Sequence, residues 1–222
     1  MCNQPATSVE HAPPKCIFPE TKDVQDGKDY RKNLITVPSC DAHNLQKSED
    51  DEYLFCVLSM SILNNKTGNN QFATKVMRAL QKKPGLRKKV LKETRSVTVE
   101  DALKEKTFRT GAFRIDELRL NDIYDKMARA IFYHHYGKKF LDLIDIFPEH
   151  YLAISDDLAL SRTINAERES LRLALDSCFE KAAVHGDNSE VFSYQFVEPP
   201  ELTSIIARFH FYGSTRITVV FK

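Results

Sequence analysis

Residues 8–14 read SVEHAPP and residues 32–44 read KNLITVPSCDAHN, and these two stretches decide what fold we expect for the first part of the chain. Glu10 and His11 stand just before two prolines, which favour an extended or turning backbone over a helix. The run from Leu34 to Val37 is apolar and rich in β-branched residues, so it predicts a short strand that Pro38 ends. The predicted extended segments therefore carry a carboxylate beside a histidine.

The residue types in these stretches suit metal-assisted hydrolysis of a phosphodiester bond. Histidine has a pKa that suits a general base, which takes a proton from water. A hard cation such as Mg²⁺ prefers oxygen ligands, and Glu10 and Asn44 offer a carboxylate and an amide oxygen. Taken singly, each of these residues is more simply explained as an ordinary surface or core residue. Only their order and spacing together indicate a site.

In that order and spacing the residues resemble the HNH, or ββα-metal, endonuclease superfamily. Glu10-His11 is similar to the acid-histidine pair of the family, and Asn33-Leu34 to its middle asparagine at the start of a strand. Cys40-x-x-His43-Asn44 resembles the closing knuckle, and the acidic stretch 46–53 is similar to one that follows the motif in a subfamily. The resemblance covers residues 1–53.

The resemblance implies a fold and a catalytic role for four residues. His11 would be the general base that activates water, and Asn33 would orient it through local hydrogen bonds. Glu10 and Asn44 would hold one catalytic divalent ion, Mg²⁺ or Mn²⁺. The implied product ends are a 5′-phosphate and a 3′-hydroxyl.

The resemblance also implies a structural zinc ion. Cys40 and His43 have the spacing of half of a tetrahedral zinc site, and Cys2 is the third candidate ligand. The first knuckle of the family has two cysteines, and the partner of Cys2 would fall just before Met1. The sequence therefore supplies three zinc ligands instead of four. Cys16 follows the two prolines and is expected to be a buried thiol.

Composition narrows the class of protein. No stretch approaches the roughly 18–20 apolar residues that span a bilayer, and residues 1–20 contain no apolar run typical of a secretory signal. Five cysteines at wide spacing do not resemble a disulfide framework. We therefore expect a cytoplasmic protein with no membrane partner.

Charge is distributed unevenly along the chain. The net charge is only +1, but residues 66–95 carry ten Lys or Arg and the single acid Glu93. A local excess of this kind is what phosphate binding uses, although many charged runs are simply solvated helix faces. The predicted nucleic-acid-binding residues are Lys75, Arg78, Lys82, Lys83, Arg87, Lys88, Lys89 and Lys92.

The rest of the chain predicts an α+β domain. Helical spacing predicts helices within 53–63, 71–83, 86–94, 120–136 and 158–183, and composition predicts a loop at 64–70. Alternating patterns predict strands at 140–146 and 190–197, a hairpin of 205–212 with 215–221, and a strand or hairpin around Gly111. The expected architecture is an N-terminal ββα-metal HNH module at 1–55, followed by a mixed domain at 56–222 that ends in an antiparallel sheet.

The leading hypothesis is a metal-dependent HNH endonuclease acting on nucleic acid, chiefly DNA, in a setting such as phage defence. One alternative is a non-catalytic nucleic-acid-binding protein that keeps the ββα fold as a scaffold. A second is an interaction protein whose C-terminal domain docks a protein partner.

Overall fold

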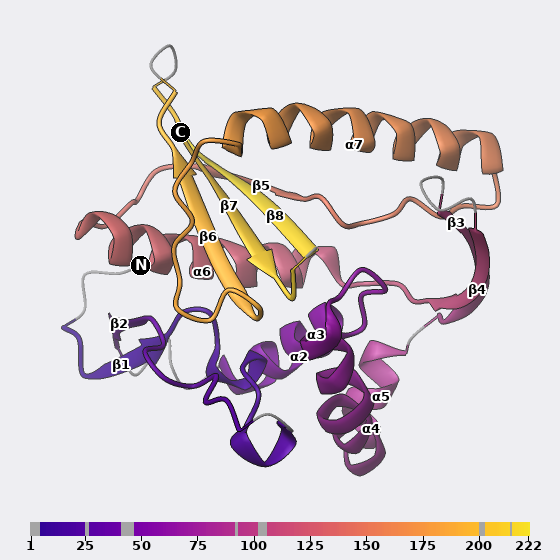
Figure 1. The fold of residues 1–222 in the computed structure, drawn as a ribbon, viewed down its shortest axis with the longest axis horizontal. Coiled ribbons are helices and arrows are strands. Elements are labelled where there is room, and N and C mark those ends of the chain that lie inside the picture. The colour runs from indigo at the N-terminus through magenta and orange to yellow at the C-terminus, as the bar shows by residue number, and fades with distance from the viewer. Residues whose placement is uncertain are drawn as a thin grey trace.

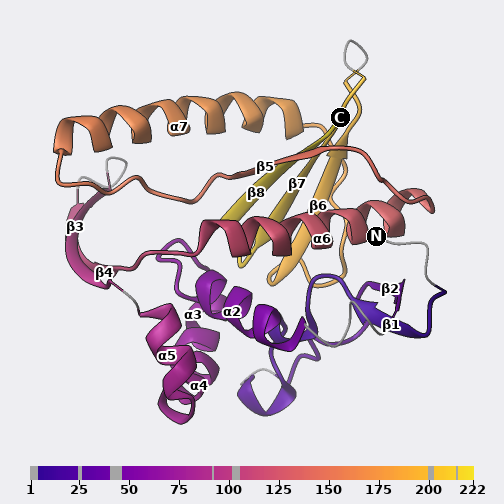
Figure 2. The same ribbon diagram turned by 180° about the vertical axis from the view of Figure 1, so that it is seen from behind.

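The computed structural model describes residues 5–24, 27–40, 47–91, 93–101, 106–199, 203–213 and 215–222 of the 222-residue chain. Figures 1 and 2 show the arrangement from two opposite sides. The elements follow in the order β1 (Ser8–His11), η1 (Lys15–Ile17), η2 (Thr21–Asp23), β2 (Thr36–Ser39), α2 (Lys47–Ser59), α3 (Lys66–Gln71), the π-helical turn η3 (Phe72–Val76), α4 (Met77–Lys82), α5 (Pro84–Val90), β3 (Arg95–Asp101), β4 (Lys106–Ala112), α6 (Glu117–Tyr136), β5 (Ile144–Pro148), α7 (Leu158–Phe179), β6 (Phe192–Val197), β7 (Ile205–Phe211) and β8 (Thr215–Phe221). The protein is therefore mixed α+β with a C-terminal antiparallel sheet, as predicted.

The N-terminal part contains a two-stranded antiparallel sheet followed by a helix. Strands β1 and β2 pair from Ser8 opposite Ser39 to His11 opposite Thr36. The prediction that Pro38 ends the second strand is wrong, because Pro38 lies inside β2 opposite Val9. A proline is tolerated there because each strand of a two-stranded sheet has an open edge, where a missing N–H costs no ladder bond.

Helix α2 connects this sheet to the core. Its residues from Tyr53 to Ser59 are all buried, and those from Tyr53 to Leu58 belong to one hydrophobic cluster with α6 and the C-terminal sheet. The predicted boundary between residues 55 and 56 therefore falls inside α2.

The composition of residues 64–70 predicted a loop, and the structure corrects this prediction. Helix α3 begins after Asn65, whose Oδ1 accepts a hydrogen bond from the backbone N–H of Gly68 at 3.0 Å. Gly68 packs so closely on Tyr212 that a Cβ there would lie 2.8 Å from its ring. The cap and this tertiary contact together stabilise a helix in a sequence with little intrinsic helical preference.

Helix α6 and the C-terminal sheet form the centre of the molecule. The sheet has the strand order β5-β8-β7-β6, with all neighbours antiparallel. Helix α6 covers one face of the sheet (Figures 1 and 2), where Phe132 contacts Phe140, Phe196 and Phe221 at ring-centroid distances of 5.1, 6.2 and 4.9 Å. The aromatic residues that alternate along the strands therefore form core, as expected from their spacing.

The opposite face of the same sheet is polar. Arg208 on β7 is buried and donates from Nε to Oε1 of Glu149 at 2.8 Å and from a terminal nitrogen to Oδ1 of Asp176 on α7 at 2.5 Å. Thr218 on β8 donates to the same oxygen of Glu149 at 2.7 Å. The C-terminal half of α7 therefore meets this face through charged groups, whereas α6 meets the other face through rings.

Two histidines near the polar face make stability depend on pH. Burial lowers the pKa of both His150 and His210 from 6.5 to about 4. Between those values the unfolded chain binds protons that the folded chain does not. Stability should therefore be complete above about pH 6.5 and fall as the pH drops towards 4, by at most about 1.4 kcal/mol per pH unit for each histidine.

Thermal unfolding between pH 7 and pH 4.5 tests this expectation. Replacing His210 by glutamine should flatten the fall in Tm, because that titrating group is removed. The exposed His134 on α6 is the matched control, and His134→Gln should leave the slope as it is in the wild type. An equal slope in all three proteins would contradict the expectation.

Within the described residues, no helix combines the length and the apolar character needed to cross a membrane.

Candidate functional site

The β1–β2 sheet positions the predicted acid-histidine pair. Glu10 lies opposite Val37 and His11 opposite Thr36, and both side chains are half-buried. The hydroxyl of Ser39 donates to Oε2 of Glu10 at 3.0 Å, which orients the carboxylate. Sequence reasoning missed Ser39, although its place two residues beyond Val37 puts it on the same face as Glu10.

The side chains of Glu10 and His11 point to opposite faces of β1, because successive side chains alternate along a strand. His11 is the last residue of β1, and the chain turns at the following prolines. The carboxylate and the imidazole can therefore reach the same substrate atoms only if the substrate lies at the end of the sheet. The end at which β1 finishes and β2 begins is thus the candidate site.

The middle asparagine is held by a distant loop. Asn33 has a φ of 53°, in the left-handed region that asparagine tolerates better than most residues. Its Nδ2 donates to Oδ2 of Asp187 at 2.7 Å, and Asn188 donates from Nδ2 to the carbonyl of Lys32 at 3.0 Å. Tyr30 adds a hydrogen bond to Glu190 at 2.5 Å. The loop before β6 thus fixes the segment that enters β2, and no local signal in the sequence predicts this pairing.

The predicted metal ligands are described only in part. Cys40 directly follows β2 and is buried, and Glu10 lies in β1 as stated. Cys2, His43 and Asn44 lie outside the described residues. Among the residues that are described, no group of three or more His, Cys, Asp or Glu side chains gathers as a metal site.

Three of the predicted nucleic-acid-binding cations bind the N-terminal part of the chain. Lys75 donates to the carbonyl of Cys16 at 2.9 Å and lies 3.7 Å from a carboxylate oxygen of Glu20. Arg78 pairs with Asp23 at 2.7 Å, and Lys83 pairs with Glu52 at 2.8 Å. Burial, with a smaller contribution from Arg31, lowers the pKa of Lys75. These cations therefore neutralise acids of the N-terminal part.

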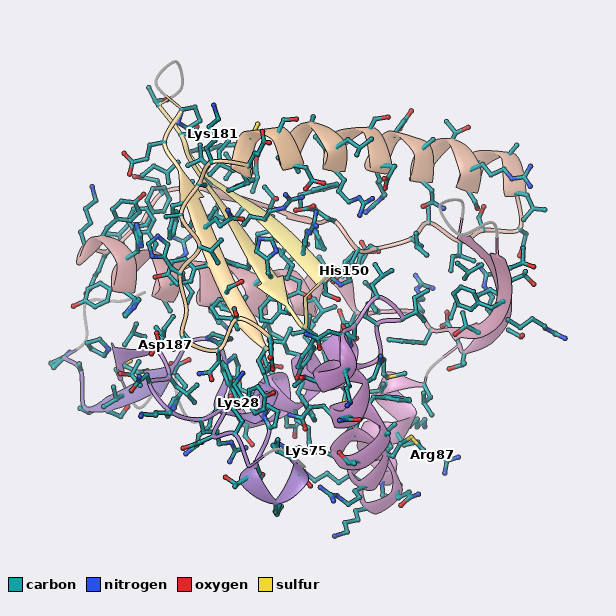
Figure 3. All side chains as sticks on the ribbon, in the orientation of Figure 1. Lys28, Lys75, Arg87, His150, Lys181 and Asp187 are labelled. Carbon is teal, nitrogen blue, oxygen red and sulfur yellow. The ribbon has the colours of Figure 1, made fainter. Side chains whose placement is uncertain are left out.

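A cavity of about 360 Å³ lies beside Lys75, Lys83 and Glu52. Its lining residues are Cys16, Ser48, Asp51, Glu52, Phe55, Lys75, Ala79 and Lys83. The side chain of Lys75, labelled in Figure 3, is only 20% exposed.

Other predicted cations remain on the surface. Lys82, Arg87 and Lys88 are exposed on α4 and α5, and Arg87 extends away from the molecule in Figure 3. The side chains of Lys89 and Lys92 lie outside the described part of the chain. The surface of α4 and α5 is thus where cations are presented outward.

Charge reversal should have different effects at a cation paired with an acid and at a cation that only faces solvent. Arg78→Glu would place a carboxylate beside the nearly buried side chain of Asp23, so we expect a loss of about 1 kcal/mol and a fall in Tm of about 2–4 °C. Lys88→Glu should leave Tm unchanged and, under the prediction that this surface binds nucleic acid, weaken duplex binding in a gel-shift assay. If Arg78→Glu instead weakened binding with no change in Tm, the structural role of the pair with Asp23 would be contradicted.

Comparison with known proteins gives no relative: no family model, no curated protein and no solved structure matches the chain.

Proposed function

We propose that the chain is a metal-dependent HNH-type endonuclease that hydrolyses phosphodiester bonds of nucleic acid, with DNA as the preferred substrate. The observation that carries this proposal is the carboxylate-histidine pair at the end of β1, whose partner strand β2 follows after the short turns η1 and η2 and is itself followed by α2. Asn44, the last residue of the motif, precedes that helix by three positions.

The proposed roles follow from the side chains. His11 takes the proton from the attacking water at a ring nitrogen, and Glu10 would hold a divalent ion through a carboxylate oxygen. Asn44 would supply the second protein ligand through its amide oxygen. Ser39 is a positioning residue, because its hydrogen bond to Glu10 fixes the carboxylate that would face the ion. Mg²⁺ or Mn²⁺, when bound, would neutralise the charge that grows on the phosphate and the leaving oxygen.

A structural zinc ion held by Cys2, Cys40 and His43 is a separate part of the proposal. Cys40 supports it, because this buried thiol directly follows β2, where a zinc ligand would tie the end of the two-stranded sheet to the other ligands. The zinc content of freshly purified protein, with Cys40→Ser as the comparison, tests this part independently of catalysis.

Metal-dependent plasmid nicking tests the catalytic proposal. The wild-type chain should convert supercoiled plasmid to the open circle in Mg²⁺ or Mn²⁺ and should be inactive in EDTA. Glu10→Gln keeps an acceptor for Ser39 but removes the charged ligand, so it should require at least about 10–100-fold more metal for half-maximal activity, the loss that follows when even a group that only orients a ligand is changed. If the wild type left DNA and RNA intact with every divalent ion, the nuclease proposal would fail.

A further inference from the structure

Strands β3 and β4 form a two-stranded ribbon that belongs to neither of the other sheets. They pair from Arg95 opposite Ala112 to Asp101 opposite Lys106. The ribbon lies beside the N-terminal end of α7, and the candidate site lies at the other end of the molecule (Figures 1 and 2). An isolated two-stranded ribbon is only marginally stable in water, so a partner that covers it would add stability.

The two faces of the ribbon differ in chemistry. On one face Val97, Val99 and Thr110 are half-buried, and Arg95 on that face donates to the carbonyl of Ile154 at 2.5 Å and pairs with Asp156 at 3.3 Å. This face therefore turns towards the loop that precedes α7.

The opposite face is exposed and rich in hydrogen-bonding groups. Its exposed residues are Ser96, Thr98, Thr107, Arg109 and Gly111. Thr98 and Arg109 are directly opposite each other, and the Arg109 guanidinium lies 3.5 Å from the Ser96 hydroxyl across the strands. An arginine among small hydroxyl residues presents donors and acceptors without bulky side chains that would keep a ligand at a distance.

The stretch of sequence that contains the ribbon is basic. Residues 84–114 carry nine Lys or Arg and four Asp or Glu. Within them, the exposed Arg87 and Lys88 stand on α5, which leads directly into β3. Such an excess favours a polyanionic partner over a neutral peptide strand.

We propose that the exposed face of the β3–β4 ribbon enters the major groove of duplex DNA, an inference that rests on the proposed function for its choice of nucleic acid. The major groove of B-DNA, about 12 Å wide, admits a two-stranded ribbon, whereas the deep, narrow major groove of A-form RNA excludes side chains. Arg109 donates to a guanine edge, Thr98 and Ser96 meet neighbouring bases, and Arg87 and Lys88 contact flanking phosphates.

The remote position of the ribbon adds a geometric consequence. Because ribbon and candidate site lie at opposite ends of the molecule, one duplex must run the length of the protein to reach both. Cutting then occurs away from the base pairs that the ribbon contacts. Productive substrates should therefore be duplexes that extend well beyond the contacted bases.

Fluorescence anisotropy tests the ribbon without catalysis. The protein carries His11→Ala, and the probes are a duplex DNA of about 30 base pairs, roughly 100 Å long, the duplex RNA of the same sequence, and one DNA strand. Arg109→Ala should weaken duplex DNA binding by about 10-fold, and Thr98→Val, which keeps the strand-forming shape, by about fivefold. Lys181→Ala is the matched control, since Lys181 is exposed after the end of α7 remote from the ribbon (Figure 3), and it should change affinity by less than about twofold.

The inference would be overturned if Arg109→Ala bound duplex DNA as tightly as the protein with an unchanged ribbon. It would also be overturned if duplex RNA bound as tightly as duplex DNA, or if none of the three probes bound. Nicking is measured separately, in proteins that retain His11. Nicking that persists at the wild-type rate in Arg109→Ala overturns the ribbon inference and leaves the nuclease proposal standing. Ribbon-dependent binding by a protein that never cuts supports the ribbon inference and overturns the nuclease proposal.

Discussion

Replacing His11 by alanine is expected to lower the rate of plasmid nicking by about 10²–10⁴-fold, the usual contribution of general-base catalysis. Under the proposed function, His11 accepts the proton of the attacking water, and alanine cannot. The position at the end of β1 and the half-buried side chain suggest little effect on folding. Initial rates in saturating Mg²⁺ measure the loss.

Thr36→Ala provides the matched control for His11→Ala. Thr36 lies directly opposite His11 in β2 and is exposed, so both substitutions shorten one side chain at the same end of the sheet. Thr36→Ala should keep most of the nicking activity. Equal nicking by the wild type and His11→Ala would remove His11 from the catalytic role, and equal losses in both variants would indicate a structural effect.

Replacing Arg208 by methionine is expected to destabilise the protein by about 3–5 kcal/mol. The side chains of Arg208 and Glu149 are only 3% and 1% exposed, so the substitution would leave a buried carboxylate without its cation. Asp176 on α7 would lose a partner as well. Urea denaturation followed by circular dichroism measures the change in the free energy of unfolding.

A double variant identifies the cause of that loss. Arg208→Met combined with Glu149→Leu removes both charges and should recover most of the stability, because a buried ion pair is often replaceable by apolar residues of similar volume. The single variant Glu149→Leu should be destabilising, since it leaves Arg208 buried beside Asp176 alone. A double variant that is as unstable as either single variant would contradict the charge argument.

Local patterns in the sequence predicted those elements whose stabilising contacts are local. Helix α6 was predicted at 120–136 and runs from Glu117 to Tyr136. Asp116 caps its start through the N–H of Arg119, and Gly137, with a φ of 69°, ends it. The β7–β8 hairpin was likewise predicted, because apolar and polar residues alternate along much of each strand and Gly213 stands between them.

The candidate site was predictable in residue type but not in its supporting contacts. Glu10, His11 and Asn33 were recognised from their order in the sequence. The hydrogen bond of Asn33 to Asp187 joins residues far apart in the chain, and nothing near either residue signals it. Ser39 was missed because a serine at the end of a strand is common and acquires its role only from the register of β1 with β2.

The sequence by itself determined the α+β class and the residues suited to metal-assisted hydrolysis, because periodicity and residue chemistry are local properties. Only the tertiary structure decided that Lys75, Arg78 and Lys83 face acids of the N-terminal part while Arg87 and Lys88 face outward. The physical reason is that charge along a chain does not say which groups meet in space. Packing of η3 and α4 against the N-terminal part brings three of the ten cations of the basic run into ion pairs with its acids.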